Sequence, residues 1–130
     1  MKNFRIYLLM RNDMASMTIG RVAAQAHHAS DAIAHAIQKS YPESINDYIE
    51  WKRESKQEFG TVIVLACDKE TMYNRYNMVK DHIPSVIVHD ETYRINDGAE
   101  THYIPVDTCA CFLVDMTDGD DKFFSDLPLL

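Results

Sequence analysis

The sequence predicts an α/β fold: a single-domain, three-layer sandwich in which a mixed sheet of about four strands carries helices on both faces. Two observations lead to this prediction. Short apolar runs rich in β-branched residues alternate with longer stretches whose apolar residues recur at helical spacing. With 130 residues, 46% of them hydrophobic and 25% charged, the chain suits one hydrophobic core and one domain spanning 1–130.

The first half of the chain is predicted to form a strand and two helices. The apolar run 4–11 indicates a strand, and 18–39 follows as a helix because its apolar residues recur every three or four positions. Pro42 cannot continue that helix. A second helix is therefore expected over 44–57, with Ser44 as its N-cap.

The second half is predicted to contain three strands. The run 61–66 is continuously apolar, which is typical of a strand buried on both faces. Asp68 then stands where the N-cap of a helix over 69–82 is expected. The remaining expected elements are strands at 85–89 and 108–114 and a weak helix at 120–126.

A hairpin signal lies between the last two predicted strands. Asn96-Asp97-Gly98 is a turn sequence, and it separates two short β-prone runs at 93–95 and 101–104. On this interpretation Asp97 is a turn residue with no further role.

Composition limits the classes of function. The net charge of −7 argues against non-specific nucleic-acid binding, but the positive charges gather early in the chain. We therefore expect any RNA-binding face to include Arg5, Arg11 and Arg21, opposite an acidic C-terminal face. No apolar run approaches the roughly 20 residues of a membrane span, and the N-terminus does not resemble a signal peptide, so a cytoplasmic protein is expected. The three cysteines are expected to be buried free thiols, since their spacing fits no zinc site.

The stretch 11–29 carries the most specific pattern in the chain. A strand end, a short polar loop and an alanine-rich helix start follow one another, which is where α/β proteins bind ligands. The stretch resembles the N-terminal signature of the archaeal/eukaryotic-type peptidyl-tRNA hydrolases, R-x-D-L-x-M-(S/G)-K-G-K-x-A-A-Q-x-x-H-A, with one extra residue after Asp13. The matching residues are Arg11, Asp13, Met17, Gly20, Ala23, Ala24, Gln25, His28 and Ala29.

The resemblance implies an enzyme that hydrolyses the ester bond of peptidyl-tRNA or N-blocked aminoacyl-tRNA, with tRNA as its partner and without a metal or other cofactor. It covers nearly the whole chain, because 61–71 and the closing leucines are also similar to the family. A homodimer is a candidate assembly. The substrate-binding residues that the resemblance implies are Arg11, Asp13, Gly20, Gln25 and His28.

The position of the family's aspartate stays open between two registers. The family loop D-A-G-x-T-Q-I-x-P-G is longer here by about six or seven residues. Counted forward from the strand at 85–89, Asp90 occupies the family position. Counted back from the strand at 108–114, Asp97 does, and Thr101 then reproduces the D-x-x-x-T spacing. A carboxylate in this position could anchor or deprotonate a water, and the threonine could position it.

Arg21 takes the place of the family's catalytic lysine. An arginine keeps the positive charge and binds phosphate or an oxyanion well, but it does not release a proton at working pH. If the lysine acts through its charge, Arg21 can replace it. The alternative function is a catalytically degenerate relative that serves as an RNA- or protein-binding module.

Overall fold

The computed structural model describes residues 2–130 and contains a four-stranded mixed sheet in the order β2-β1-β4-β3. Its strands are β1 (Phe4–Arg11), β2 (Val62–Cys67), β3 (Ser85–Asp97) and β4 (Glu100–Asp115). The strands β1 and β2 run parallel, and the other two neighbouring pairs are antiparallel. The predicted α/β fold with a mixed sheet is confirmed.

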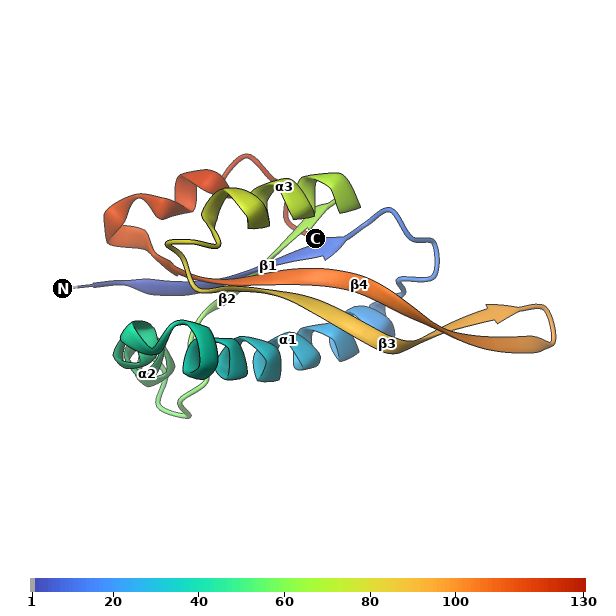
Figure 1. Ribbon diagram of the computed structural model, residues 1–130, viewed down its shortest axis with the longest axis horizontal. Helices are drawn as coiled ribbons and strands as arrows, with labels where there is room; N and C mark the ends of the chain where they lie inside the picture. The colour runs from blue at the N-terminus through green and yellow to red at the C-terminus, as the bar shows by residue number, and fades with distance from the viewer. Residues whose placement is uncertain (1) are drawn as a thin grey trace.

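Helices cover both faces of this sheet, as expected. Figure 1 shows α1 (Ile19–Ser40) and α2 (Ile45–Arg53) on one face, with α3 (Lys69–Val79) and the C-terminal 3-10 turns on the other. Each face has its own layer of buried apolar side chains, because successive strand residues point to opposite sides. Among residues 2–130, no helix is long and apolar enough to cross a membrane.

Two local predictions in the first two-thirds of the chain hold only in part. Ser44 does occupy the N-cap position of α2, but its side chain makes no capping bond, because a 3-10 turn at Pro42–Ser44 runs directly into α2 and Ser44 is not extended (φ −101°, ψ 5°). The strand β2 is buried on both faces only over its last three residues, because it lies at the edge of the sheet and its first residues are more exposed. Its outer edge is partly paired with the chain end, where Leu129 forms a bridge with Leu65.

Other local predictions hold. Asp68 caps α3 by accepting a 2.8 Å hydrogen bond from the Thr71 amide. All three cysteines are buried and free, and burial raises the pKa of Cys67 to about 11 and that of Cys109 to about 12. The weak helix expected at 120–126 is a 3-10 turn at Asp120–Phe123 rather than an α-helix.

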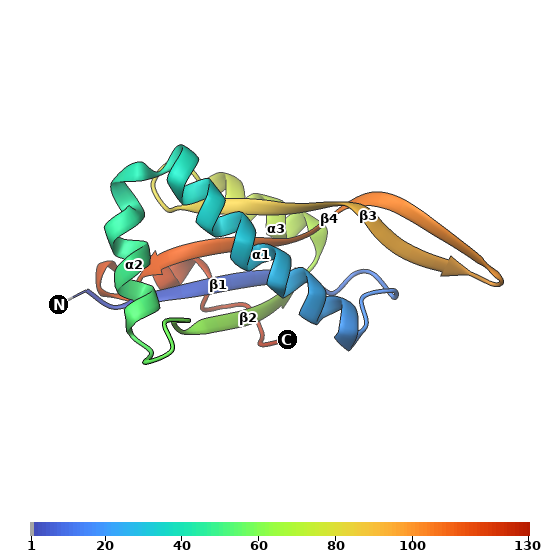
Figure 2. The same ribbon diagram turned by 90° about the horizontal axis from the view of Figure 1, so that it is seen from below.

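The last two strands are much longer than predicted, because the expected hairpin continues both of them. β3 and β4 pair out to Asp97 and Glu100 and are joined by a two-residue turn at Gly98 and Ala99. Gly98 has a φ of +60°, which suits a glycine in the first central position of such a turn. Figure 2 shows the resulting hairpin projecting beyond the rest of the molecule, with the start of α1 beside its base.

Candidate functional site

A chain of three side chains links α1 to the last two strands. The Thr108 hydroxyl donates a 2.7 Å hydrogen bond to Gln25 Oε1, and Gln25 Nε2 donates a 2.8 Å hydrogen bond to Asp90 Oδ2. Thr108 is fully buried and Gln25 is nearly so. Since an ionised carboxylate only accepts hydrogen bonds, this order fixes the amide of Gln25 with its nitrogen toward Asp90.

A β-bulge in β4 places Thr108 in this chain. Val88 pairs with Cys109 and the next residue, His89, pairs with Asp107, so Thr108 is the extra residue. Thr108 and Cys109 consequently both contact Gln25, although neighbours in a regular strand point to opposite faces. Bulges commonly re-aim a side chain in this way beside functional sites.

A second bulge, in β3, turns Tyr93 toward the helix that Asp90 also faces. Glu91 and Thr92 together lie opposite Pro105, which has no amide hydrogen for a regular ladder. The amide of Thr92 instead donates a 2.9 Å hydrogen bond to Asp90 Oδ1. The bulge therefore both completes the surroundings of the carboxylate and brings Tyr93 onto the α1 side of the sheet.

The surroundings of Asp90 keep it ionised. Partial burial raises the pKa of Asp90, but hydrogen bonds from Gln25 and Thr92 outweigh this effect, and the nearby charge of His28 adds to them. The net pKa of Asp90 lies below its ordinary value. Because a carboxylate offers about four acceptor positions and Asp90 uses three, one remains for a water or a ligand.

Arg21 lies on α1 one helical turn before Gln25. Its side chain contacts Tyr93 of β3, the strand that also carries Asp90. Its guanidinium carbon lies 5.8 Å from the centre of the Tyr93 ring, and its Nη1 donates a 2.7 Å hydrogen bond to the Ser16 carbonyl. No carboxylate pairs with Arg21 among residues 2–130. Its charge is thus available to an anion at the start of α1, one helical turn from the Gln25 that holds Asp90.

The structure does not bring Asp97 or Thr101 to this cluster. Asp97 stands beside the turn of the hairpin, seven residues beyond Asp90, which corresponds to roughly 20 Å along a strand. Thr101 is opposite Asn96 in the same hairpin and donates a 3.2 Å hydrogen bond to its side chain. The geometry therefore favours the register in which Asp90 follows the strand.

Arg11 and Asp13 also lie away from Asp90, on the α3 side of the sheet. Arg11 Nε donates a 2.8 Å hydrogen bond to Asp13, and Asp13 accepts a 3.0 Å bond from the amide of Lys69 at the start of α3. The Arg11 bond holds the pKa of Asp13 below its usual range. Both residues thus have structural contacts that join β1 to α3.

The three arginines that were expected to form one basic face do not do so. Arg5 and Arg11 lie near opposite ends of β1 and each pairs with a carboxylate, Glu54 at 3.5 Å and Asp13 at 2.8 Å. Only Arg21 keeps an unpaired charge among the three. The prediction failed because sequence alone did not reveal which acidic side chains approach each arginine.

Gly20 and His28 lie on α1 on either side of the cluster. Gly20 is exposed in the first turn, and a Cβ atom there would meet nothing within 4 Å, so the helix start is open to a ligand. His28 is exposed, and its charge reaches Asp90 as described above.

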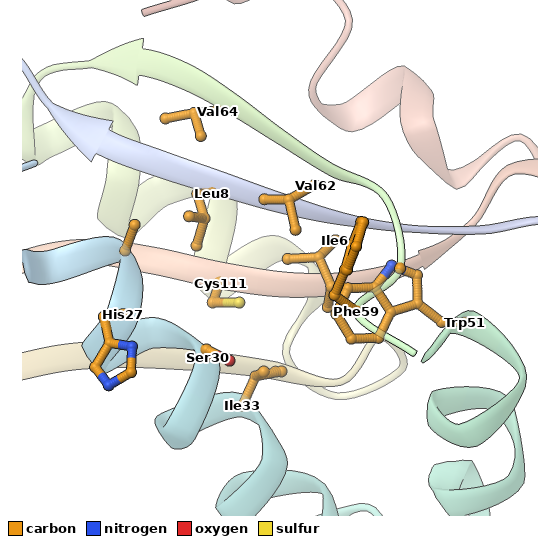
Figure 3. Close-up of a pocket in the computed structure, with 12 residues that line it drawn as sticks. Ile6, Leu8, His27, Ser30, Ile33, Trp51, Phe59, Val62, Val64 and Cys111 are labelled. Atoms are coloured by element: carbon orange, nitrogen blue, oxygen red, sulfur yellow. The ribbon is translucent and has the colours of Figure 1, made fainter. Parts of the chain in front are cut away.

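A separate apolar pocket of about 400 Å³ lies between α1, β1 and β2. Figure 3 shows Leu8, Val64, Phe59 and Trp51 around it, with His27 on its α1 side. Neither Asp90 nor Arg21 lines this pocket. Its mainly apolar walls suit an ester or a phosphate poorly, so we place the candidate site at Asp90.

The cluster around Asp90 is suited to an anionic substrate attacked by water. One carboxylate can hold a water, and a guanidinium without a carboxylate partner in the described part of the chain, one helical turn before Gln25, can meet negative charge. Among residues 2–130, no group of three or more His, Cys, Asp or Glu side chains could hold a metal ion.

These features describe a candidate site on a small α/β fold, and comparison with known families identifies the family to which the chain belongs. Residues 4–127 match the model of the family described as Peptidyl-tRNA hydrolase PTH2, and the chain belongs to this family. A search of curated proteins found no match.

Sequence reasoning missed two residues of the cluster, Thr108 and Tyr93. Both reach α1 only because of the bulges, which shift the alternation of side chains by one position. Pro105 was the available signal, since a proline directly after the predicted run 101–104 calls for an irregular pairing.

Proposed function

We propose that this protein hydrolyses the ester bond between the acyl group and the terminal ribose of peptidyl-tRNA or N-blocked aminoacyl-tRNA, releasing free tRNA without a metal ion. The observation that carries the proposal is the family match over residues 4–127. The cluster of Thr108, Gln25, Asp90 and Arg21 supports it, because each chemical requirement of ester hydrolysis has a candidate group there.

Asp90 is proposed to anchor the attacking water. Its free acceptor position can take a hydrogen bond from water, while Gln25 and Thr92 hold the carboxylate in place. A carboxylate with a lowered pKa is a weak base. Asp90 therefore acts mainly by orienting the water and accepting part of its proton as the carbon–oxygen bond forms.

Arg21 is proposed to stabilise negative charge, either on the carbonyl oxygen in the transition state or on a phosphate near the 3′ end of the tRNA. Four of its five N–H groups remain after the bond to Ser16. A guanidinium that stays protonated suits this electrostatic role and excludes proton transfer.

The second candidate function is a binding module that holds RNA or a protein without hydrolysing an ester. The observation that favours it is Arg21, which stands where the family has its catalytic lysine. This reading requires that proton transfer from the lysine is essential to the reaction.

The experiment that separates the two functions incubates the purified protein with N-acetyl-aminoacyl-tRNA, with and without EDTA. We expect release of the acyl group above the buffer rate in both conditions. If the acyl group is released without EDTA but not in its presence, the proposed metal independence is wrong. Absence of release together with measurable tRNA binding favours the binding module.

A further inference from the structure

Tyr93 is a buried aromatic residue in the segment where this chain is longer than its family's loop. Its ring is 2% exposed and lies beneath the Arg21 guanidinium at 5.8 Å. Its hydroxyl lies 2.9 Å from the Ser16 hydroxyl. Tyr93 thus contacts both Arg21 and the loop that precedes α1.

These contacts form a closed arrangement of three residues. Arg21 donates to the carbonyl of Ser16 at 2.7 Å, Ser16 shares a hydrogen bond with the Tyr93 hydroxyl, and the Tyr93 ring lies under Arg21. The guanidinium is therefore held from one edge and one face, while its remaining N–H groups are free.

This arrangement lowers the entropic cost of holding an arginine side chain in one conformation at position 21. A long side chain has many rotamers, and fixing it in one of them is entropically costly. An aromatic face attracts a planar guanidinium through cation–π contact, and burial of the ring fixes where that face lies.

We propose that Tyr93 is a positioning residue that holds the Arg21 guanidinium toward the Asp90 site. This inference rests on the proposed hydrolysis for its kinetic consequence. The bulge in β3 contributes to this arrangement, because without its extra residue Tyr93 would point to the α3 side of the sheet.

The first test is a double-mutant cycle with Tyr93→Leu and Arg21→Ala. We expect Tyr93→Leu to lower the rate of ester hydrolysis about two- to fivefold, the range expected for losing one cation–π contact. The loss should fall on the same parameter, kcat or KM, that Arg21→Ala changes. In the Arg21→Ala background, Tyr93→Leu should have almost no further effect. Equal losses in both backgrounds, or no loss in either, would overturn the proposal.

Tyr103→Leu provides the matched control. Tyr103 belongs to the same hairpin, is 64% exposed and pairs with Arg94 rather than lying against Arg21. We expect it to leave kcat and KM unchanged. Tyr93→Phe keeps the ring and loses only the hydroxyl bond to Ser16, so it should retain most of the activity that Tyr93→Leu loses.

A second measurement covers the case in which Tyr93→Leu does not fold. Phenylalanine at position 93 is compared with its trifluorinated analogue, which has nearly the same shape but a face with less negative charge. We expect the fluorinated residue to lower the rate of ester hydrolysis when Arg21 is present and to leave it unchanged in the Arg21→Ala variant. Unchanged activity in both would mean that the ring only fills space.

The proposed function and this inference fail in different ways. If the wild-type protein hydrolyses no ester, the proposed function fails, and the contact is then tested by the NMR signal of the Arg21 Nε–H group. In Tyr93→Phe, the Arg21 Nε–H signal should keep the ring-current shift caused by the aromatic ring. In Tyr93→Leu this shift should disappear. If the signal is the same in both variants, Tyr93 does not hold Arg21.

Discussion

The side-chain amide of Gln25 donates a 2.8 Å hydrogen bond to Asp90, joining the second turn of α1 to β3 across 65 positions of sequence. Gln25 is 3% exposed, so its amide cannot exchange this bond freely for water. Because Thr108 occupies the other end of the amide, the orientation of Gln25 does not depend on substrate. The carboxylate is thus held in place before any ligand binds, which is what a water-anchoring group requires.

The two aspartates of the lengthened loop should differ in their effect on hydrolysis. We expect Asp90→Asn to lower kcat on N-acetyl-aminoacyl-tRNA by on the order of tenfold to a thousandfold, because an amide binds water without accepting its proton. Asp97→Asn should leave kcat within about twofold of the wild type, since Asp97 lies beside the hairpin turn. The reverse ranking would assign the family's aspartate to Asp97.

Thr108 should act on Asp90 through Gln25. Thr108→Val keeps the shape of the side chain but leaves the buried Gln25 oxygen without its donor. We expect a loss of about 1–3 kcal/mol in the free energy of unfolding, measured with urea, and a lower kcat. Thr108→Ser keeps the hydroxyl and should retain most of the activity. A Thr108→Val protein with unchanged kcat would show that Gln25 needs no fixed orientation.

Arg21→Lys separates charge from proton transfer, because it restores the residue type of the family. If the cation acts only through its charge, kcat should stay the same or fall a few-fold, since a shorter lysine with a compact ammonium group weakens the cation–π contact with Tyr93. We expect this result. A clear rise in kcat would mean that the family's lysine contributes proton transfer that an arginine cannot supply.

The sequence was sufficient for the architecture of the protein. The periodicities of 4–11 and 18–39 gave β1 and α1 to within one residue, and Asp68 marked the start of α3. These features are local, since alternation and capping depend on neighbours along the chain. The resemblance of 11–29 likewise pointed to the family that the whole-chain match shows.

The candidate site was harder to predict because its geometry depends on strand pairing. Whether Asp90 or Asp97 faces α1 is decided by the register of β3 against β4 and by two bulges. A one-residue bulge reverses the direction of every later side chain, and the signal for that shift, Pro105, lies on the partner strand, 15 residues from Asp90. Ion pairs posed the same difficulty, since the partner of Arg5, Glu54, is distant in sequence.

Stability should depend on acid pH through carboxylates with lowered pKa values. Burial raises the pKa of Asp107, but hydrogen bonds from Tyr73 and His89 outweigh it, and the pKa values of Asp13 and Asp90 are lowered as well. When the pKa of a carboxyl group is lower in the folded protein, the unfolded chain binds more protons in acid. The stabilisation is then complete above the ordinary value of 3.8 and is lost as the pH falls through the lower, folded values.

We therefore expect the thermal midpoint, followed by circular dichroism, to change little from pH 7 to 5 and to fall steeply from about pH 4 to 2. Asp107→Asn removes one of these carboxylates, so the fall between pH 4 and 2 should become shallower. Asp97→Asn, beside the hairpin turn, is the matched control and should leave the slope unchanged. If both variants keep the wild-type slope, the hydrogen bonds of Asp107 do not contribute to acid unfolding.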